Sequence, residues 1–129
     1  MYDNGYEPEK AIDGKISAEY SFFHSKSENN PWLELSLPER YISGVYIVTR
    51  YDNLNRVRDI EFRAGLDPVP SDFRGRLTVN TKVATFVGPA EGHLKVYLIN
   101  FDRKILAKYV TLQRIGYGVS LEINEVLMF

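Results

Sequence analysis

The sequence has no cysteine, which excludes disulfides, thiolate metal sites and cysteine nucleophiles together. It also has no excess of either charge, because 16 basic and 17 acidic residues leave a formal net charge of -1. A surface of that balance has little attraction for a phosphate backbone, so we expect no nucleic-acid partner. No apolar run approaches the roughly 18 residues of a membrane span and no signal peptide is recognisable, so we expect no membrane insertion.

Motifs for catalysis and for phosphate binding are missing as well. Gly-x-Ser-x-Gly, the P-loop and the dinucleotide-binding Gly-x-Gly-x-x-Gly do not occur. The two histidines, His24 and His93, are too few for a zinc cluster, and no carboxylate pair stands out among the acids. We therefore expect a protein that is not an enzyme.

The pattern that is present is one of short strands. No window keeps apolar residues at helical spacing, whereas several runs alternate or are rich in β-branched and aromatic residues. A length of 129 residues suits one domain with a single core, spanning residues 1–129. The expected strands are residues 32–37, 45–50, 60–65, 82–88, 94–101, 108–115 and 119–129.

Turn residues separate these runs, notably at residues 37–44 and 100–103, which we predict to be turns. Short strands separated by such turns predict an antiparallel β-sandwich. Residues 1–30 are polar and contain glycine, so we expect long loops packed over one end of the sandwich. Long loops in a compact domain are usually functional.

An Asp-Gly turn in this first segment has the composition of a cation site. Asp13 lies in "KAIDGK", among main-chain carbonyls and upstream of the hydroxyl of Ser21. A calcium ion takes six to eight oxygen ligands, so this loop needs one further carboxylate from elsewhere. From the spacing alone, an Asp-Gly turn without metal remains the favoured alternative.

A second polar cluster follows the expected strand at residues 45–50. The stretch "TRYDNLNR" holds Arg50, Asp52 and Arg56, and His24 lies upstream in another polar loop. One reading is a solvated strand end with weak ion pairs. The other is a set of N–H donors, oriented by Asp52, that binds the hydroxyls of a neutral sugar.

The order of these motifs resembles the F-type lectin (fucolectin) family, a branch of the galactose-binding, discoidin-like jelly-roll domains. The similar pieces are "AIDG", the histidine of "FFH", "NNPW", "TRYD", a further arginine and "LEINEVLMF". The resemblance covers most of the chain and implies an all-β antiparallel β-sandwich jelly roll. The family's first strand, ahead of "YDNGYEP", is not found here, which would leave an exposed sheet edge.

In this family the histidine and both arginines donate hydrogen bonds to α-L-fucose, which implies the same role for His24, Arg50 and Arg56. Asp52 corresponds to the acid that holds the loop between the arginines. That loop is one residue shorter here than in the family pattern, so Arg58 is the alternative donor to Arg56.

The shortened loop also lacks the adjacent cysteines that pack against the sugar in many family members. Leu54, with Asn53, is expected to supply that surface. Trp32 begins a core strand and is interpreted as structural. The candidates for the apolar wall around the 6-methyl group of fucose are Tyr2, Tyr20, Phe22 and Phe23.

The resemblance also turns the Asp-Gly loop into a predicted calcium site, because the family carries a structural calcium there. The missing carboxylate would be Glu125, with the carbonyl of Asn124 beside it. The metal would hold the long loops that carry His24. The full implied ligand set is Lys10, Asp13, Lys15, Ser21, Asn124 and Glu125.

The implied function is recognition of L-fucose or fucosylated glycans by an extracellular or secreted lectin, and a homo-oligomer is left open. Two alternatives remain at this stage. One is a discoidin-like protein-binding or adhesion module without fucose binding. The other is the sugar-targeting module of a larger enzyme or toxin.

Overall fold

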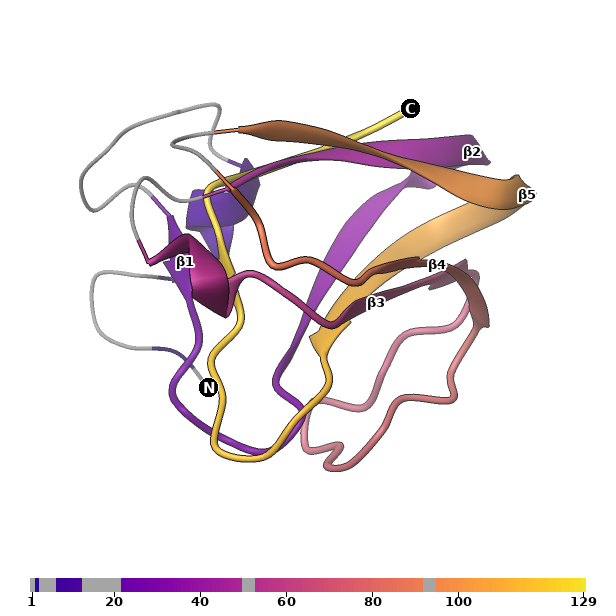
Figure 1. The fold of residues 1–129 in the computed structure, drawn as a ribbon. Helices are drawn as coiled ribbons and strands as arrows, with labels where there is room; N and C mark the ends of the chain where they lie inside the picture. The colour runs from indigo at the N-terminus through magenta and orange to yellow at the C-terminus, as the bar shows by residue number, and fades with distance from the viewer. Residues whose placement is uncertain (1, 3–6, 13–21, 50–52, 92–94) are drawn as a thin grey trace.

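The computed structural model describes residues 2, 7–12, 22–49, 53–91 and 95–129, and its regular secondary structure is mostly β-strand (Figure 1). None of the helices in these ranges is long and apolar enough to cross a membrane. The elements are the 3-10 turns η1 (Pro8–Ile12) and η2 (Leu54–Arg56) and the strands β1 (Phe23–His24), β2 (Trp32–Val48), β3 (Ile60–Gly65), β4 (Thr81–Phe86), β5 (Val96–Arg114), β6 (Glu122–Ile123) and β7 (Glu125–Met128).

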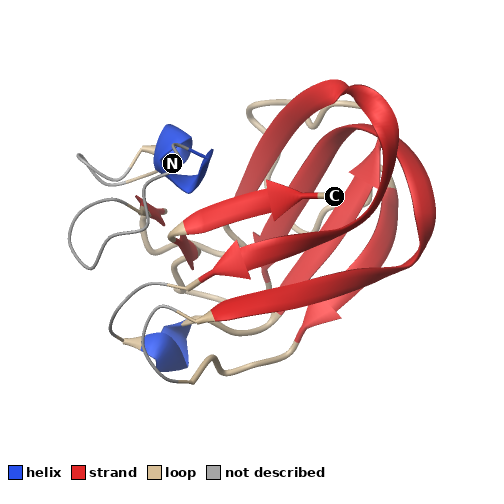
Figure 2. Cartoon of the chain, turned by 90° about the horizontal axis from the view of Figure 1, so that it is seen from above, coloured by secondary structure: helices blue, strands red, loops and turns tan. Residues whose placement is uncertain are grey.

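Two long strands build both layers of the sandwich. β2 and β5 pair antiparallel along their whole length, and both curve round at one end of the molecule (Figures 1 and 2). The sheet order is β4-β3-β5-β2-β7, so the first half of β2 lies with β3 and β4 and its second half lies beside β7. This is the expected antiparallel β-sandwich.

The turns predicted at residues 37–44 and 100–103 are wrong, because both segments are strand. Arg40, Tyr41 and Ile42 pair with Ala107, Leu106 and Ile105, so the chain bends without leaving the ladder. The register shifts between Ser36 and Arg40 and again between Ile42 and Gly44, which is how bulges let a strand turn a corner. The strands expected at residues 32–37 and 45–50 are therefore parts of one bent strand, β2, which ends at Val48. Those expected at residues 94–101 and 108–115 are parts of another, β5, described from Val96.

The core lies between the two layers and is formed by alternate residues of each strand. In the first half of β2, Leu33 and Leu35 are buried while Trp32 and Glu34 are half-buried on the outer face. Phe62 of β3 and Leu112 of β5, which are partners in the ladder, are both fully buried. This period of two is what a half-buried antiparallel sheet requires.

A smaller ribbon covers one end of the sandwich. β1 pairs antiparallel with β6, and the isolated bridge between Glu28 and Val119 continues this contact. η1 packs against both β1 and β7. The first segment of the chain therefore lies beside its C-terminal segment, and the described residues contain no α-helix.

The loop of residues 66–80 lies across the outer face of the β4-β3-β5-β2 layer and is held there by side chains of the strands beneath it. Glu34 of β2 accepts a hydrogen bond from the Val69 N–H at 2.7 Å, and the indole of Trp32 donates to the Phe73 carbonyl at 3.3 Å. Burial raises the pKa of Glu34, and the Val69 N–H partly opposes that shift. A loop of this length is unusual unless it is anchored or functional.

Gln113 of β5 is the strongest of these anchors. Its Nε2 donates to the carbonyls of Asn30 and Gly75, both at 2.8 Å, and its Oε1 accepts from the Leu77 N–H at 2.8 Å. The side chain is buried, so its amide is satisfied entirely within the protein.

We expect Gln113→Leu to lower the free energy of unfolding by about 3 kcal/mol or more, because it leaves backbone groups of the loop without partners. Urea-induced unfolding followed by circular dichroism measures this loss. Glu39→Gln is the control, since its exposed pair with Lys108 contributes little. A loss no larger than that of the control would show that the loop is held by other contacts.

Candidate functional site

The centre of the candidate site is a buried carboxylate beneath His24. The side chain of Glu122 is 0% exposed, and its Oε1 lies 2.7 Å from Nε2 of His24. The two residues are direct partners in the β1-β6 ladder, which holds the imidazole over the carboxylate. The other ring nitrogen, Nδ1, lies 2.6 Å from the carbonyl of Ser25. With an oxygen facing each nitrogen, the ring donates from both only as an imidazolium.

Arg56 reaches the same carboxylate from a different part of the chain. It ends η2, and its Nη1 lies 3.5 Å from Oε1 of Glu122. Its side chain is 52% exposed, so the guanidinium has one side toward Glu122 and much of its surface toward solvent. Glu122 therefore holds an imidazole and a guanidinium side by side at the surface.

The structure distinguishes between the two candidate arginines of the shortened loop. Arg56 lies against the carboxylate of Glu122, whereas Arg58 has a different partner. Arg58 Nε pairs with Oδ2 of Asp59 at 3.1 Å. Of the two, Arg56 is the one that the structure brings to His24.

The sequence reasoning did not identify Glu122. Both Glu122 and Glu125 fall in residues 121–126, a segment that is buried throughout. Acids flanked by buried apolar residues are rare and need partners, so the alternation of Leu121, Glu122 and Ile123 was the available signal. Of the two acids, only the neighbouring Glu125 is assigned a role from the sequence, as a metal ligand.

A further guanidinium lies behind this cluster. Burial lowers the pKa of Arg114, the carboxylates of Glu122 and Asp59 oppose that shift, and the positive charges of Arg58 and Arg56 add to it. Arg114 Nη1 donates to the Ser120 carbonyl at 2.9 Å. Among the described residues, the guanidiniums of Arg56, Arg58 and Arg114 outnumber the carboxylates of Glu122 and Asp59, which favours a ligand that accepts hydrogen bonds.

Among the four aromatic candidates for an apolar wall, Phe22 lies next to His24. Their ring centroids are 6.1 Å apart, and Phe22 is buried. Phe23 points into the core, and Tyr2 is exposed and bridges to Ser25. Tyr20 lies outside the described residues.

The loop residues Asn53 and Leu54 lie beside Arg56. Asn53 has a left-handed backbone conformation (φ 52°) at the start of η2 and is exposed. Leu54 is half-buried and packs against the core, so only part of its surface is available to a ligand. Arg50 and Asp52 lie outside the described residues.

The described members of the predicted calcium site are Lys10, Asn124 and Glu125. Asn124 and Glu125 are 0% and 2% exposed, and η1, which carries Lys10, packs against β7, which carries Glu125. A carboxylate, an amide and main-chain carbonyls are hard oxygen donors of the kind that calcium takes, so these residues fit the ion. Asp13, Lys15 and Ser21 lie outside the described residues. Within the described ranges, no three His, Cys, Asp or Glu side chains gather as a metal-binding group.

Comparison by sequence finds no relatives: no protein-family model matches the chain, and no curated protein is similar to it in sequence. Comparison of folds does find similar structures, and those described next are carbohydrate-binding β-sandwich modules. The chain has the fold that F-type lectins share with family 32 carbohydrate-binding modules, as the sequence predicted.

Three solved structures illustrate this similarity. The fucolectin from the serum of striped bass, Morone saxatilis, is 22% identical with a TM-score of 0.83, over 99% of this chain and 43% of that one. A fucose-binding module of Streptococcus pneumoniae is 21% identical with a TM-score of 0.76, over 100% and 86%. The family 32 module of Clostridium perfringens NanJ, in complex with galactose, is 22% identical with a TM-score of 0.75, over 98% and 87%. The chain thus spans less than half of the bass protein.

We expect the pair of His24 and Glu122 to be energetically coupled. A double-mutant cycle of His24→Ala and Glu122→Gln, measured by urea unfolding, should give a coupling energy of about 1–2 kcal/mol, because either single change leaves a largely buried polar group without this partner. The matched control is the cycle of Lys108→Ala and Glu39→Gln, an exposed pair 3.7 Å apart whose coupling should stay below about 0.5 kcal/mol. Equal coupling in the two cycles would contradict the central role of Glu122.

Proposed function

We propose that the chain is a carbohydrate-binding module that recognises L-fucose at the end of a fucosylated glycan, without catalysis. The observation that carries this proposal is the cluster in which the buried Glu122 holds His24 and Arg56 together at the surface. Rigid charged donors beside an apolar wall suit a ligand that is rich in hydroxyls and uncharged. The fold, shared with fucose-binding and galactose-binding modules, supports the same ligand class.

Within this proposal each residue has a distinct task. Arg56 donates to sugar oxygens through the exposed part of its guanidinium. His24 is the second donor, and a hydroxyl that takes its Nε2–H competes with Glu122 for that proton. The available part of Leu54 supplies apolar surface, the buried Phe22 packs beside the imidazole of His24, and Arg50 supplies the second guanidinium that the family resemblance implies.

We place the module outside the cell, where glycans are displayed, and expect several copies to act together. A single shallow sugar site gives weak affinity, and linked copies raise the effective affinity without any new contact.

Arg56→Ala should weaken the binding of L-fucose at least about tenfold, because a hydrogen bond to a charged donor contributes about 1.5–3 kcal/mol. Isothermal titration calorimetry of the whole chain with L-fucose, in the presence of calcium, measures the change. The control is Arg58→Ala, which removes an arginine two positions away that pairs with Asp59.

The choice of sugar is tested in the same experiment by D-galactose. Tighter binding of D-galactose than of L-fucose would contradict fucose specificity. If no fucosylated glycan binds the unmodified chain, the discoidin-like protein-binding alternative takes the place of this proposal.

The second part of the proposal is a structural calcium ion held by Asn124 and Glu125 together with Lys10, Asp13, Lys15 and Ser21. Calcium would tie the first segment of the chain to its C-terminal segment, next to the ladder that carries His24 and Glu122. The ion would neutralise the buried carboxylate of Glu125, which otherwise needs other partners.

Calcium at about 100 times its dissociation constant should stabilise the chain by about 2.7 kcal/mol and raise its melting temperature by roughly 10 °C relative to excess chelator. Glu125→Gln should reduce that difference strongly, whereas Glu39→Gln, a surface change, should leave it intact. Melting curves by differential scanning calorimetry with calcium and with EGTA measure both. An unmodified chain that melts at the same temperature in both buffers would exclude the calcium site.

A further inference from the structure

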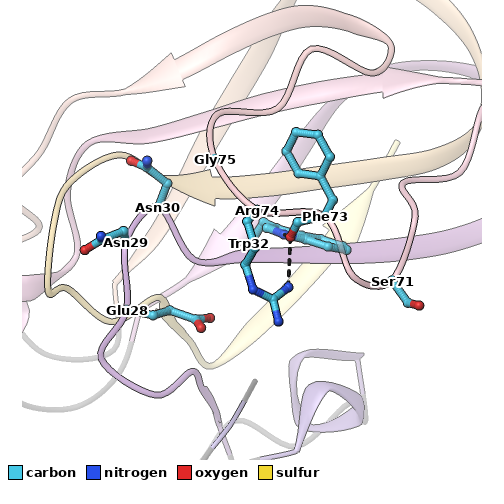
Figure 3. A pocket seen from close by; sticks show the side chains of 8 residues that line it. All are labelled: Glu28, Asn29, Asn30, Trp32, Ser71, Phe73, Arg74 and Gly75. Atoms are coloured by element: carbon cyan, nitrogen blue, oxygen red, sulfur yellow. Dashed lines mark hydrogen bonds between the residues drawn. The ribbon is translucent and has the colours of Figure 1, made fainter.

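A hollow on another part of the molecule combines aromatic and polar side chains. Its first part, about 310 Å³, is lined by Trp32, Phe73 and Arg74 together with Glu28 and Asn29 (Figure 3). A second part of about 530 Å³ shares five lining residues with the first and extends to Tyr117. Together they form one groove, named the Trp32–Tyr117 groove here, of a size that small-molecule sites have.

The walls of this groove are held in place before any ligand binds. The buried Gln113 ties the Asn30 and Gly75 carbonyls together on one side. On the other side, Asn30 Oδ1 accepts from the Gly116 N–H at 2.9 Å, and Asn29 Oδ1 accepts from the Gly118 N–H at 3.0 Å. A preformed site loses less entropy on binding than a mobile one.

Tyr117 stands out on these walls. It is 83% exposed, although the glycines on either side of it are fixed by the two asparagine side chains. An aromatic ring held in solvent on an anchored turn carries a hydration cost that burial against an apolar ligand face would relieve. At the opposite end, the indole of Trp32 has its N–H bonded to the Phe73 carbonyl, so the indole offers the groove its apolar surface.

The charges in the groove argue for a neutral ligand. Figure 3 shows the carboxylate of Glu28 and the guanidinium of Arg74 directed toward the same part of the hollow. Their charges offset, and Arg76, in the second part, pairs with Glu61 at 2.7 Å. Hydrogen-bonding capacity remains, because the Nδ2 of Asn29 donates to no group in the described part of the chain.

We propose that the Trp32–Tyr117 groove is a second saccharide site, which takes a neutral pyranose ring. The apolar C–H face of such a ring packs on Tyr117, and its hydroxyls bond to Glu28, Asn29 and Arg74, which line both parts of the groove, with Trp32 at the far end as a neighbouring apolar surface. This site is separate from the His24 cluster, because none of the residues that line the groove belongs to that cluster. Glu28, which lines it, is four positions after His24, a span of up to about 13 Å in extended chain. It does not depend on the fucose proposal.

The test uses the single tryptophan of the chain as its reporter. The whole chain, labelled with ¹⁵N, is titrated with the methyl glycosides of D-galactose, D-glucose, D-mannose and N-acetyl-D-glucosamine, each up to about 20 mM. We expect at least one to shift the Trp32 indole resonance with a dissociation constant on the order of 1 mM. Tyr117→Ala should weaken that binding at least about fivefold, since an aromatic contact contributes about 1 kcal/mol or more.

Two variants control the experiment. Tyr41→Ala removes another exposed tyrosine, 64% exposed, on the bend of β2 and should leave the indole shift unchanged. Arg56→Ala, which tests the fucose proposal, should also leave it unchanged. D-glucuronate is titrated in the same way as a charged comparison. The outcomes that would overturn the second site are an indole resonance that no neutral glycoside moves, a shift seen only with D-glucuronate, or a shift that Tyr117→Ala leaves intact.

Discussion

The pairing of β2 with β5 is the interaction on which the rest of the structure depends. These strands run antiparallel through both layers of the sandwich, and every other strand of the large sheet attaches to one of them or to β3. The ladder survives the bend because bulges absorb the change of direction, which keeps backbone groups paired where a loop would expose them. The positions of the candidate sites follow from where this bent pair begins and ends.

The buried C-terminal segment, residues 121–126, contributes both to the stability of this fold and to the candidate site. Two of its acids, Glu122 and Glu125, are almost completely buried, which is costly for a carboxylate unless positive or donor groups surround it. Glu122 meets His24 of β1 and Arg56 of η2, which come from separate segments of the chain. The same carboxylate therefore stabilises the contact between these segments and brings together the donors proposed to bind a sugar.

Long-range side-chain hydrogen bonds give the irregular parts of the chain their shape. Gln113 links β5 to the loop of residues 66–80 and to Asn30, and Asn30 in turn fixes the turn at Gly116. One buried amide thus anchors segments that are far apart in the sequence. Such anchoring explains how a loop without regular structure forms a defined wall of the Trp32–Tyr117 groove.

Much of the fold could be predicted from local pattern. The alternation at residues 32–37 and 60–65 identified the start of β2 and the whole of β3. A strand that is buried on one face alternates apolar and polar residues, so its pattern is visible in its own sequence. The bends in β2 and β5 could not be predicted, because the proline and glycine of residues 37–44 are equally suited to a turn and to a bulged strand. Only the pairing partner decides between them.

For the candidate site, the order of residues establishes which kinds of side chain are available: a histidine, several arginines and an acidic C-terminal stretch. The tertiary structure determines which of them meet: Nη1 of Arg56 lies 3.5 Å from Oε1 of Glu122, whereas Nε of Arg58 pairs with Asp59. It also showed that Glu122 lies beneath His24. Residue type is a local property, whereas the distance between a carboxylate near one end of the chain and an imidazole near the other depends on the whole fold.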